Sequence, residues 1–231
     1  MRGPLAAAAA LAVLLALLAP WPLLAAQKEV CPPAAEATEP RGQSLAVMPL
    51  ELPREVGPAP LHCPICGVSL SAGEVVPGAE ARLTEAVYQW LGHNRCYELL
   101  PPGAAEGAYQ RLLQQTMTGT AVSYLRGVGN QLGAAFVLGG ILYRYRERVG
   151  TTYSASQAAS IGFDLHVVRT ADGAIVWSGR FDETQKALTE NIFNIFQFFR
   201  RGVRWLTVDE FAAQAVAETL KDFPEQLPVA K

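Results

Sequence analysis

Two cysteines, Cys63 and Cys66, are the residues of this chain whose type and spacing most clearly allow chemistry. They belong to the stretch His-Cys-Pro-Ile-Cys-Gly at residues 62–67. In zinc ribbons, a turn of this kind points two thiolates at one metal ion, and a second pair of ligands completes a tetrahedron. The same Cys-x-x-Cys spacing occurs in thiol oxidoreductases, where the pair usually lies at a helix start.

The chain holds four cysteines in all, the other two being Cys31 and Cys96. Residues 1–26 have the layout of a signal peptide, and an even number of cysteines in an exported protein more often forms disulfides than a metal site, so we expect two disulfides and no cofactor. Three pairings are open. We favour Cys63–Cys66 with Cys31–Cys96, because Cys96 opens a predicted strand and Cys31 lies on a segment that could be pinned beside it.

Two alternatives to the disulfides remain open. One is a zinc site built on the Cys63/Cys66 pair, which would be completed by residues from the set Cys31, Cys96, His62 and His93. The other is a thiol-redox pair, although Pro77 and Gly78 separate the two cysteines from the following predicted helix. Either alternative would make the chain a periplasmic thiol or metal protein.

A further pair, Asp164 and His166, falls on one face of a predicted strand. Such a pair could in principle transfer protons, but an active site also needs a positioned nucleophile, and none is evident. We therefore interpret the pair as a polar strand face, assign no catalytic residue, and expect that the protein is not an enzyme.

The first residues have the layout of a signal peptide. Arg2 is followed by an Ala/Leu run that ends at the small residues Ala25 and Ala26, so residues 1–26 are predicted to be removed on export. A retained anchor is the alternative. Lipidation at Cys31 is not expected, since Val30 is not a small residue. These features predict a periplasmic protein, with association with the outer membrane left open.

The remaining chain is predicted to hold one α/β domain at residues 43–223, after a flexible linker at 27–42 and before a tail at 224–231. Strands are expected at 44–52, 96–100, 133–148, 159–168 and 174–181, with 143–148 as an exposed extension, and helices near 83–91, 121–132 and 207–220. This order, β-α-β-α-β-β-β-α, predicts a mixed sheet of about five strands with helices packed on it.

Several of these segments resemble one family. The strand "LAVMPL", the run "QLGAAFVLGGILYRYRER", the hairpin "FDLHVVRTADGAIVWSG" and the helix "DEFAAQAVAETL" are similar to the bacterial envelope family that includes the curli secretion lipoprotein CsgG and the amino-terminal domain of TolB. The resemblance implies an assembly, secretion or scaffolding protein without catalytic residues. It covers residues 43–223 in the order of the elements.

An aromatic and basic insertion is predicted at residues 191–206, between the last strand and the last helix. It is a candidate contact surface for an envelope protein partner, a second copy or a membrane, and core packing is the alternative. Its candidate contact residues are Ile192, Phe193, Ile195, Phe196, Phe198, Phe199, Arg200, Arg201, Arg204 and Trp205. Nucleic acid is not expected as a partner, because 19 Lys and Arg stand against 21 Asp and Glu.

If this insertion is a contact surface, replacing Phe193 and Phe198 together by Ser should leave the thermal midpoint nearly unchanged. The same change should weaken association with envelope membranes or partners, measured by fractionation and pull-down. Truncation of a buried Phe costs about 3–5 kcal/mol, so collapse of the melting transition would show that the segment is core instead.

Overall fold

The computed structural model describes residues 43–53, 61–94, 97–115, 119–185 and 204–229. The predicted signal peptide and linker, together with residues 186–203, lie outside the described residues. The described residues belong to one compact unit.

A mixed five-stranded sheet forms the centre of the domain, as the sequence predicts. Its order is β4 (Glu98–Leu99), β1 (Ser44–Val47), β5 (Phe136–Arg146), β8 (Ser160–Arg169), β9 (Ile175–Thr184). Strand β1 runs parallel to β4 and β5, whereas β5, β8 and β9 pair in antiparallel fashion. The three long strands therefore make a meander attached to a short parallel edge.

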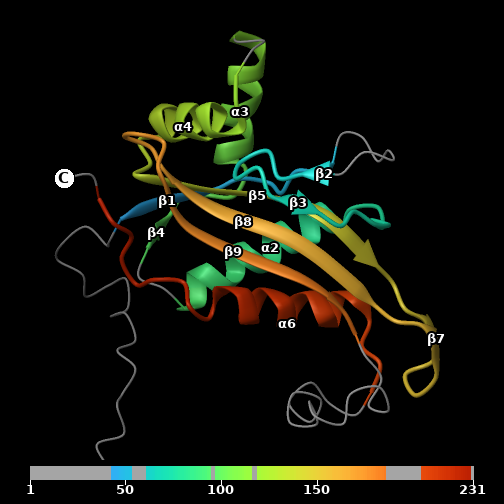
Figure 1. The fold of residues 1–231 in the computed structure, drawn as a ribbon. Helices are drawn as coiled ribbons and strands as arrows, with labels where there is room; N and C mark the ends of the chain where they lie inside the picture. The colour runs from blue at the N-terminus through green and yellow to red at the C-terminus, as the bar shows by residue number, and fades with distance from the viewer. Residues whose placement is uncertain (1–42, 54–60, 95–96, 116–118, 186–203, 230–231) are drawn as a thin grey trace, which may run out of the picture. The chain divides into compact units, whose positions relative to one another are not determined.

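One face of the sheet is covered by α2 (Ala79–Asn94) and α6 (Val208–Leu220), which lie side by side beneath it (Figure 1). Each helix turns an apolar stripe toward the strands, as its sequence period predicts. This layer holds the main hydrophobic core, with Leu83, Val87, Phe163, Phe181 and Phe211 among its buried side chains.

The opposite face has two separate covers. Helices α3 (Ala104–Gln115) and α4 (Ala121–Leu132) pack over one part, with Leu125 and Val128 buried against Val137 and Val168. The hairpin of β2 (Leu61–His62) and β3 (Ser69–Leu70) covers the other part, beside the helices (Figure 1). Neither this hairpin nor α3 was expected from the sequence.

The two covers leave β8 buried on both faces. Ile161, Phe163 and Leu165 point into the main core, as the alternating pattern predicts. The intervening side chains, including Asp164 and His166, are only 2% exposed. The polar face of this strand is therefore an interior surface.

The predicted exposed extension at the end of β5 is wrong. Tyr143 and Tyr145 are 0% and 1% exposed. A register shift between Leu142 and Arg144 places the two rings in different layers, since Tyr143 packs with the hairpin and Tyr145 with the main core. Arg144 forms an ion pair with Asp182 on β9.

The packed region extends beyond the predicted domain end at residue 223. Leu227 is 2% exposed, and its backbone N–H donates to the Gln43 side chain at 2.7 Å. Two short strands, β6 (Val149–Gly150) and β7 (Ala155–Gln157), form a small ribbon between β5 and β8.

The start of α6 forms the capping box that the sequence predicts. The Thr207 hydroxyl accepts a hydrogen bond from the Glu210 N–H at 3.2 Å, and the Glu210 carboxylate accepts from the Thr207 N–H at 3.0 Å. Both otherwise unpaired amides at the helix start are thereby satisfied.

We predict that Thr207→Ala lowers the free energy of unfolding by about 1 kcal/mol, because the cap is lost while the buried stripe is kept. Urea denaturation checks this. Thr207→Ser, which keeps the capping hydroxyl, serves as the control and should stay close to the unsubstituted protein. An unchanged midpoint in Thr207→Ala would contradict the role of the cap.

Candidate metal centre

The hairpin holds its two cysteines in a tight turn. The Cys63 N–H donates to the Val68 carbonyl at 2.9 Å, and the Gly67 N–H donates to the Cys63 carbonyl at 2.8 Å. Gly67 has φ +76°, a conformation that other residues rarely adopt, so the glycine permits the turn. The Cys66 N–H also points at the Cys63 sulfur, at 3.5 Å. This contact favours the thiolate form of Cys63.

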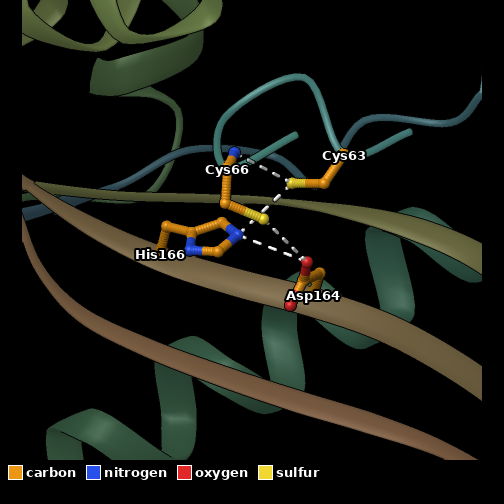
Figure 2. Close-up of side chains that lie close together, drawn as sticks. All are labelled: Cys63, Cys66, Asp164 and His166. Atoms are coloured by element: carbon orange, nitrogen blue, oxygen red, sulfur yellow. Dashed lines mark hydrogen bonds and ion pairs between the residues drawn. The ribbon is translucent and has the colours of Figure 1, made fainter. Parts of the chain in front are cut away.

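Strand β8 supplies two further ligand atoms from about a hundred residues away in the sequence (Figure 2). Among the described residues, Cys63, Cys66, Asp164 and His166 offer one ligand atom each, all within 4.8 Å of one another. Figure 2 shows the cysteines descending from the turn and the Asp164 and His166 side chains rising from the strand to meet them.

Three of the six distances between these ligand atoms are close to those of a tetrahedral site. Cys63 Sγ lies 3.3 Å from His166 Nε2, Cys66 Sγ lies 3.6 Å from Asp164 Oδ2, and His166 Nε2 lies 3.4 Å from Asp164 Oδ2. With Zn–S near 2.3 Å and Zn–N or Zn–O near 2.1 Å, tetrahedral geometry requires separations of about 3.4–3.8 Å. The other three separations are at most 4.8 Å.

Residues of β9 orient the two ligands from β8. Ser178 Oγ lies 2.7 Å from His166 Nδ1, which leaves Nε2 facing the cysteines. Arg180 contacts both carboxylate oxygens of Asp164, at 2.7 and 3.3 Å. Outer contacts of this kind fix the rotation of a ligand and tune its basicity.

The pKa of Asp164 is lowered to about 2. Burial by itself raises this pKa, but hydrogen bonds and charge from His166 and Arg180 outweigh it. The carboxylate is therefore ionised at neutral pH without a metal. It contributes stability above its ordinary pKa that is lost as the pH falls toward 2.

The pKa of Cys63 moves in the opposite direction, to about 12. Burial is the main cause, and backbone N–H groups of Cys66 and Ile65 offset part of it. Without a cation, the Cys63 thiol therefore stays protonated. A bound divalent ion would replace this proton, so metal binding here should release protons.

Charge also balances in a zinc-bound centre. Two thiolates and one carboxylate contribute three negative charges, whereas a divalent ion and the Arg180 guanidinium contribute three positive ones. A buried site with balanced charge avoids the large cost of an uncompensated interior ion.

Two of the other predicted zinc ligands, His62 and His93, do not join this cluster. His62 is exposed and contacts Ser69 at 3.3 Å, and His93 contacts the Gln89 carbonyl at the end of α2. Cys31 and Cys96 lie outside the described residues. The expected Cys63–Cys66 disulfide is not formed in the structure, where both thiols are free.

Part of the predicted contact segment can also be placed. Arg204 pairs with Glu210 at 2.6 Å, and the Trp205 N–H donates to the Thr152 carbonyl at 2.8 Å. These two residues tie the start of α6 to the loop between β6 and β7. The other predicted contact residues, from Ile192 to Arg201, lie outside the described residues.

A hollow of about 620 Å³ lies between the two covers of the sheet. The hairpin contributes Pro64 and Ile65 to one wall, and Tyr109 of α3 and Tyr124 of α4 contribute to the other. Because the Cys63/Cys66 turn carries Pro64 and Ile65, the position of that turn shapes the hollow.

Among the described helices, none is long and apolar enough to cross a bilayer. No family model and no curated protein matches the chain. Solved structures with a related arrangement were found, and all of those named below are less than 25% identical in sequence.

One is the PelC dodecamer from Paraburkholderia phytofirmans, with 16% identity, 78% of this chain and 86% of that chain covered, and a TM-score of 0.42. A second is the LpoB C-terminal domain from Escherichia coli, with 19% identity, 66% and 90% covered, and a TM-score of 0.37. A third is the lipoprotein GNA1162 from Neisseria meningitidis, with 14% identity, 69% and 99% covered, and a TM-score of 0.38.

These TM-scores are too low for the similarities to indicate a function for this chain. They also do not confirm the resemblance to CsgG or TolB.

Proposed function

We propose that this chain is a non-catalytic metal-binding domain in which Zn²⁺ holds the β2–β3 hairpin on the sheet. The observation that carries the proposal is the set of four ligand atoms from Cys63, Cys66, Asp164 and His166, which lie within 4.8 Å of one another, four being the number of ligands that structural zinc takes. The metal would join a surface turn to a central strand and act as a structural staple.

The donor set favours zinc over the hard divalent ions. Two thiolates exclude the hard ions Mg²⁺ and Ca²⁺, which prefer oxygen ligands, whereas a mixed sulfur, nitrogen and oxygen set suits Zn²⁺. Four protein ligands also complete the coordination sphere. Catalytic zinc usually keeps one position for water, so the arrangement supports a structural role.

We further propose that the domain is exported and acts as a scaffold or accessory subunit in outer-membrane or secretion assembly. The leader-like residues 1–26 and the aromatic and basic segment at 191–206 support this setting. The zinc staple suits such a role, because it would hold a surface element in one position without taking part in a reaction.

The zinc proposal predicts one bound zinc per chain in protein purified under reducing conditions, measured by elemental analysis. Cys63→Ser, Cys66→Ser and His166→Ala should each lose it. The matched control is Cys31→Ser with Cys96→Ser, which should retain full zinc. Loss of zinc in that control would instead support the four-cysteine site considered from the sequence.

A finer prediction concerns the residue behind His166. Ser178→Ala should weaken zinc binding by about 10–100-fold, measured by competition with a chromogenic chelator, because the imidazole loses the contact that orients it. Ser156→Ala, on the short ribbon away from the site, is the control. Equal affinities in both variants would show that Ser178 does not position the ligand.

Zinc affinity should also rise with pH, since binding displaces the proton of the Cys63 thiol. Repeating the chelator competition at several pH values tests this. An affinity that does not change between neutral and mildly alkaline pH would contradict thiolate coordination.

A further inference from the structure

We infer that the Cys63/Cys66 centre is also a redox switch, in which a small-molecule disulfide oxidises the two thiolates to an intramolecular disulfide and displaces the metal. This inference rests on the proposed zinc binding. It makes the disulfide and the zinc site, which the sequence presents as alternatives, two states of one pair of residues.

The two cysteine residues differ in exposure. Cys63 is 2% exposed, whereas Cys66 is only partly buried and lies at the end of the turn, with its sulfur directed at Asp164. An external disulfide therefore needs a smaller opening of the turn to reach Cys66 than to reach Cys63. Thiol exchange depends on such access as well as on thiolate character, so Cys66 is the residue that reacts first.

The turn also allows the second bond to form. The sulfurs of Cys63 and Cys66 lie within 4.8 Å of each other. A disulfide needs about 2.05 Å between its sulfurs, which is a change that side-chain rotation and a small shift of the turn can supply. Space is available at Gly67, because an added Cβ there would meet no atom within 4 Å.

The reaction proceeds in two exchange steps. The Cys66 thiolate attacks one sulfur of the external disulfide, the S–S bond of that disulfide breaks, and its other half leaves as a thiolate. The Cys63 thiolate then attacks Cys66 Sγ and expels the second half. The two cysteines lose two electrons, the external disulfide gains them, and the two released thiolates take protons from water.

The metal leaves because the oxidised sulfurs are no longer anionic ligands. Only Asp164 and His166 remain, and Arg180 stays on the carboxylate. Strand β8 is paired on both sides, by β5 and β9, so these two residues keep their places. The hairpin loses its metal bonds to β8 but keeps its packing on Ile141 and Tyr143, so the turn with Pro64 and Ile65 is held less firmly beside the hollow.

The test starts with the Cys31→Ser/Cys96→Ser protein, loaded with zinc and treated with oxidised glutathione in the presence of a chromogenic zinc chelator. We expect zinc release to keep pace with loss of both thiols. Mass spectrometry should show a product lighter by two hydrogen atoms, and peptide mapping should place the bond between Cys63 and Cys66. Reduction with dithiothreitol should restore zinc binding.

Two single variants in the same background test the order of attack without metal. With Cys63→Ser, the remaining Cys66 should form a mixed disulfide with glutathione quickly. With Cys66→Ser, the remaining Cys63 should react much more slowly in the folded protein and at a similar rate in urea. Faster reaction at Cys63 in the folded protein would overturn the assigned order.

The zinc proposal and the switch fail in different ways. If the reduced protein binds no zinc, the proposed function fails. If it binds zinc but retains the ion and both thiols in excess oxidised glutathione, the switch fails and the staple stands. Stable mixed glutathione adducts on both cysteines, without an internal disulfide, would likewise overturn the switch.

Discussion

The arrangement of this domain depends on two polar side chains buried beneath a surface hairpin. Asp164 and His166 lie on β8 with 2% of each exposed. Burying a carboxylate and an imidazole is costly unless each is paired. Arg180 and Ser178 contact them from β9, and Cys63 and Cys66 contact them from the hairpin. The hairpin can cover this face of β8 because these contacts replace the hydrogen bonds that Asp164 and His166 would otherwise make to water.

The two faces of β8 are therefore stabilised by different interactions, apolar burial on one side and polar contacts on the other. On the α2 and α6 side, Phe163, Leu165 and their neighbours are held by burial of apolar area, which does not depend on direction. On the hairpin side, the contacts of Asp164 and His166 are polar and directional, while the hairpin itself also packs on Ile141 and Tyr143 of β5. A metal ion would convert the small polar cluster into four strong bonds between the hairpin and β8.

The sequence predicts the apolar half of this architecture well. Ile161, Phe163 and Leu165 alternate as a half-buried strand should, and the α6 stripe and its Thr207/Glu210 capping box are both confirmed. The sequence does not reveal α3 as readily, because the residues that this helix buries fully, Ala105 and Ala108, are small and do not stand out as a core stripe. The burial of Tyr143 and Tyr145 was missed because a bulge breaks the alternation.

The site could be predicted only in part. The Cys63/Cys66 turn is visible as a local motif, and the shared face of Asp164 and His166 follows from the two-residue strand period. Nothing local shows that these pairs meet, since about a hundred residues separate them and the connection depends on how the hairpin folds over the sheet. The polar face of β8, opposite a regular apolar stripe, is the sequence signal that could have suggested a buried polar site.

The most direct test of this account is X-ray absorption at the zinc edge, recorded on the full-length reduced protein. The account predicts two sulfur ligands at about 2.3 Å and two nitrogen or oxygen ligands at about 2.0–2.1 Å. Four sulfur ligands, or a protein that takes up no zinc when reduced, would contradict it.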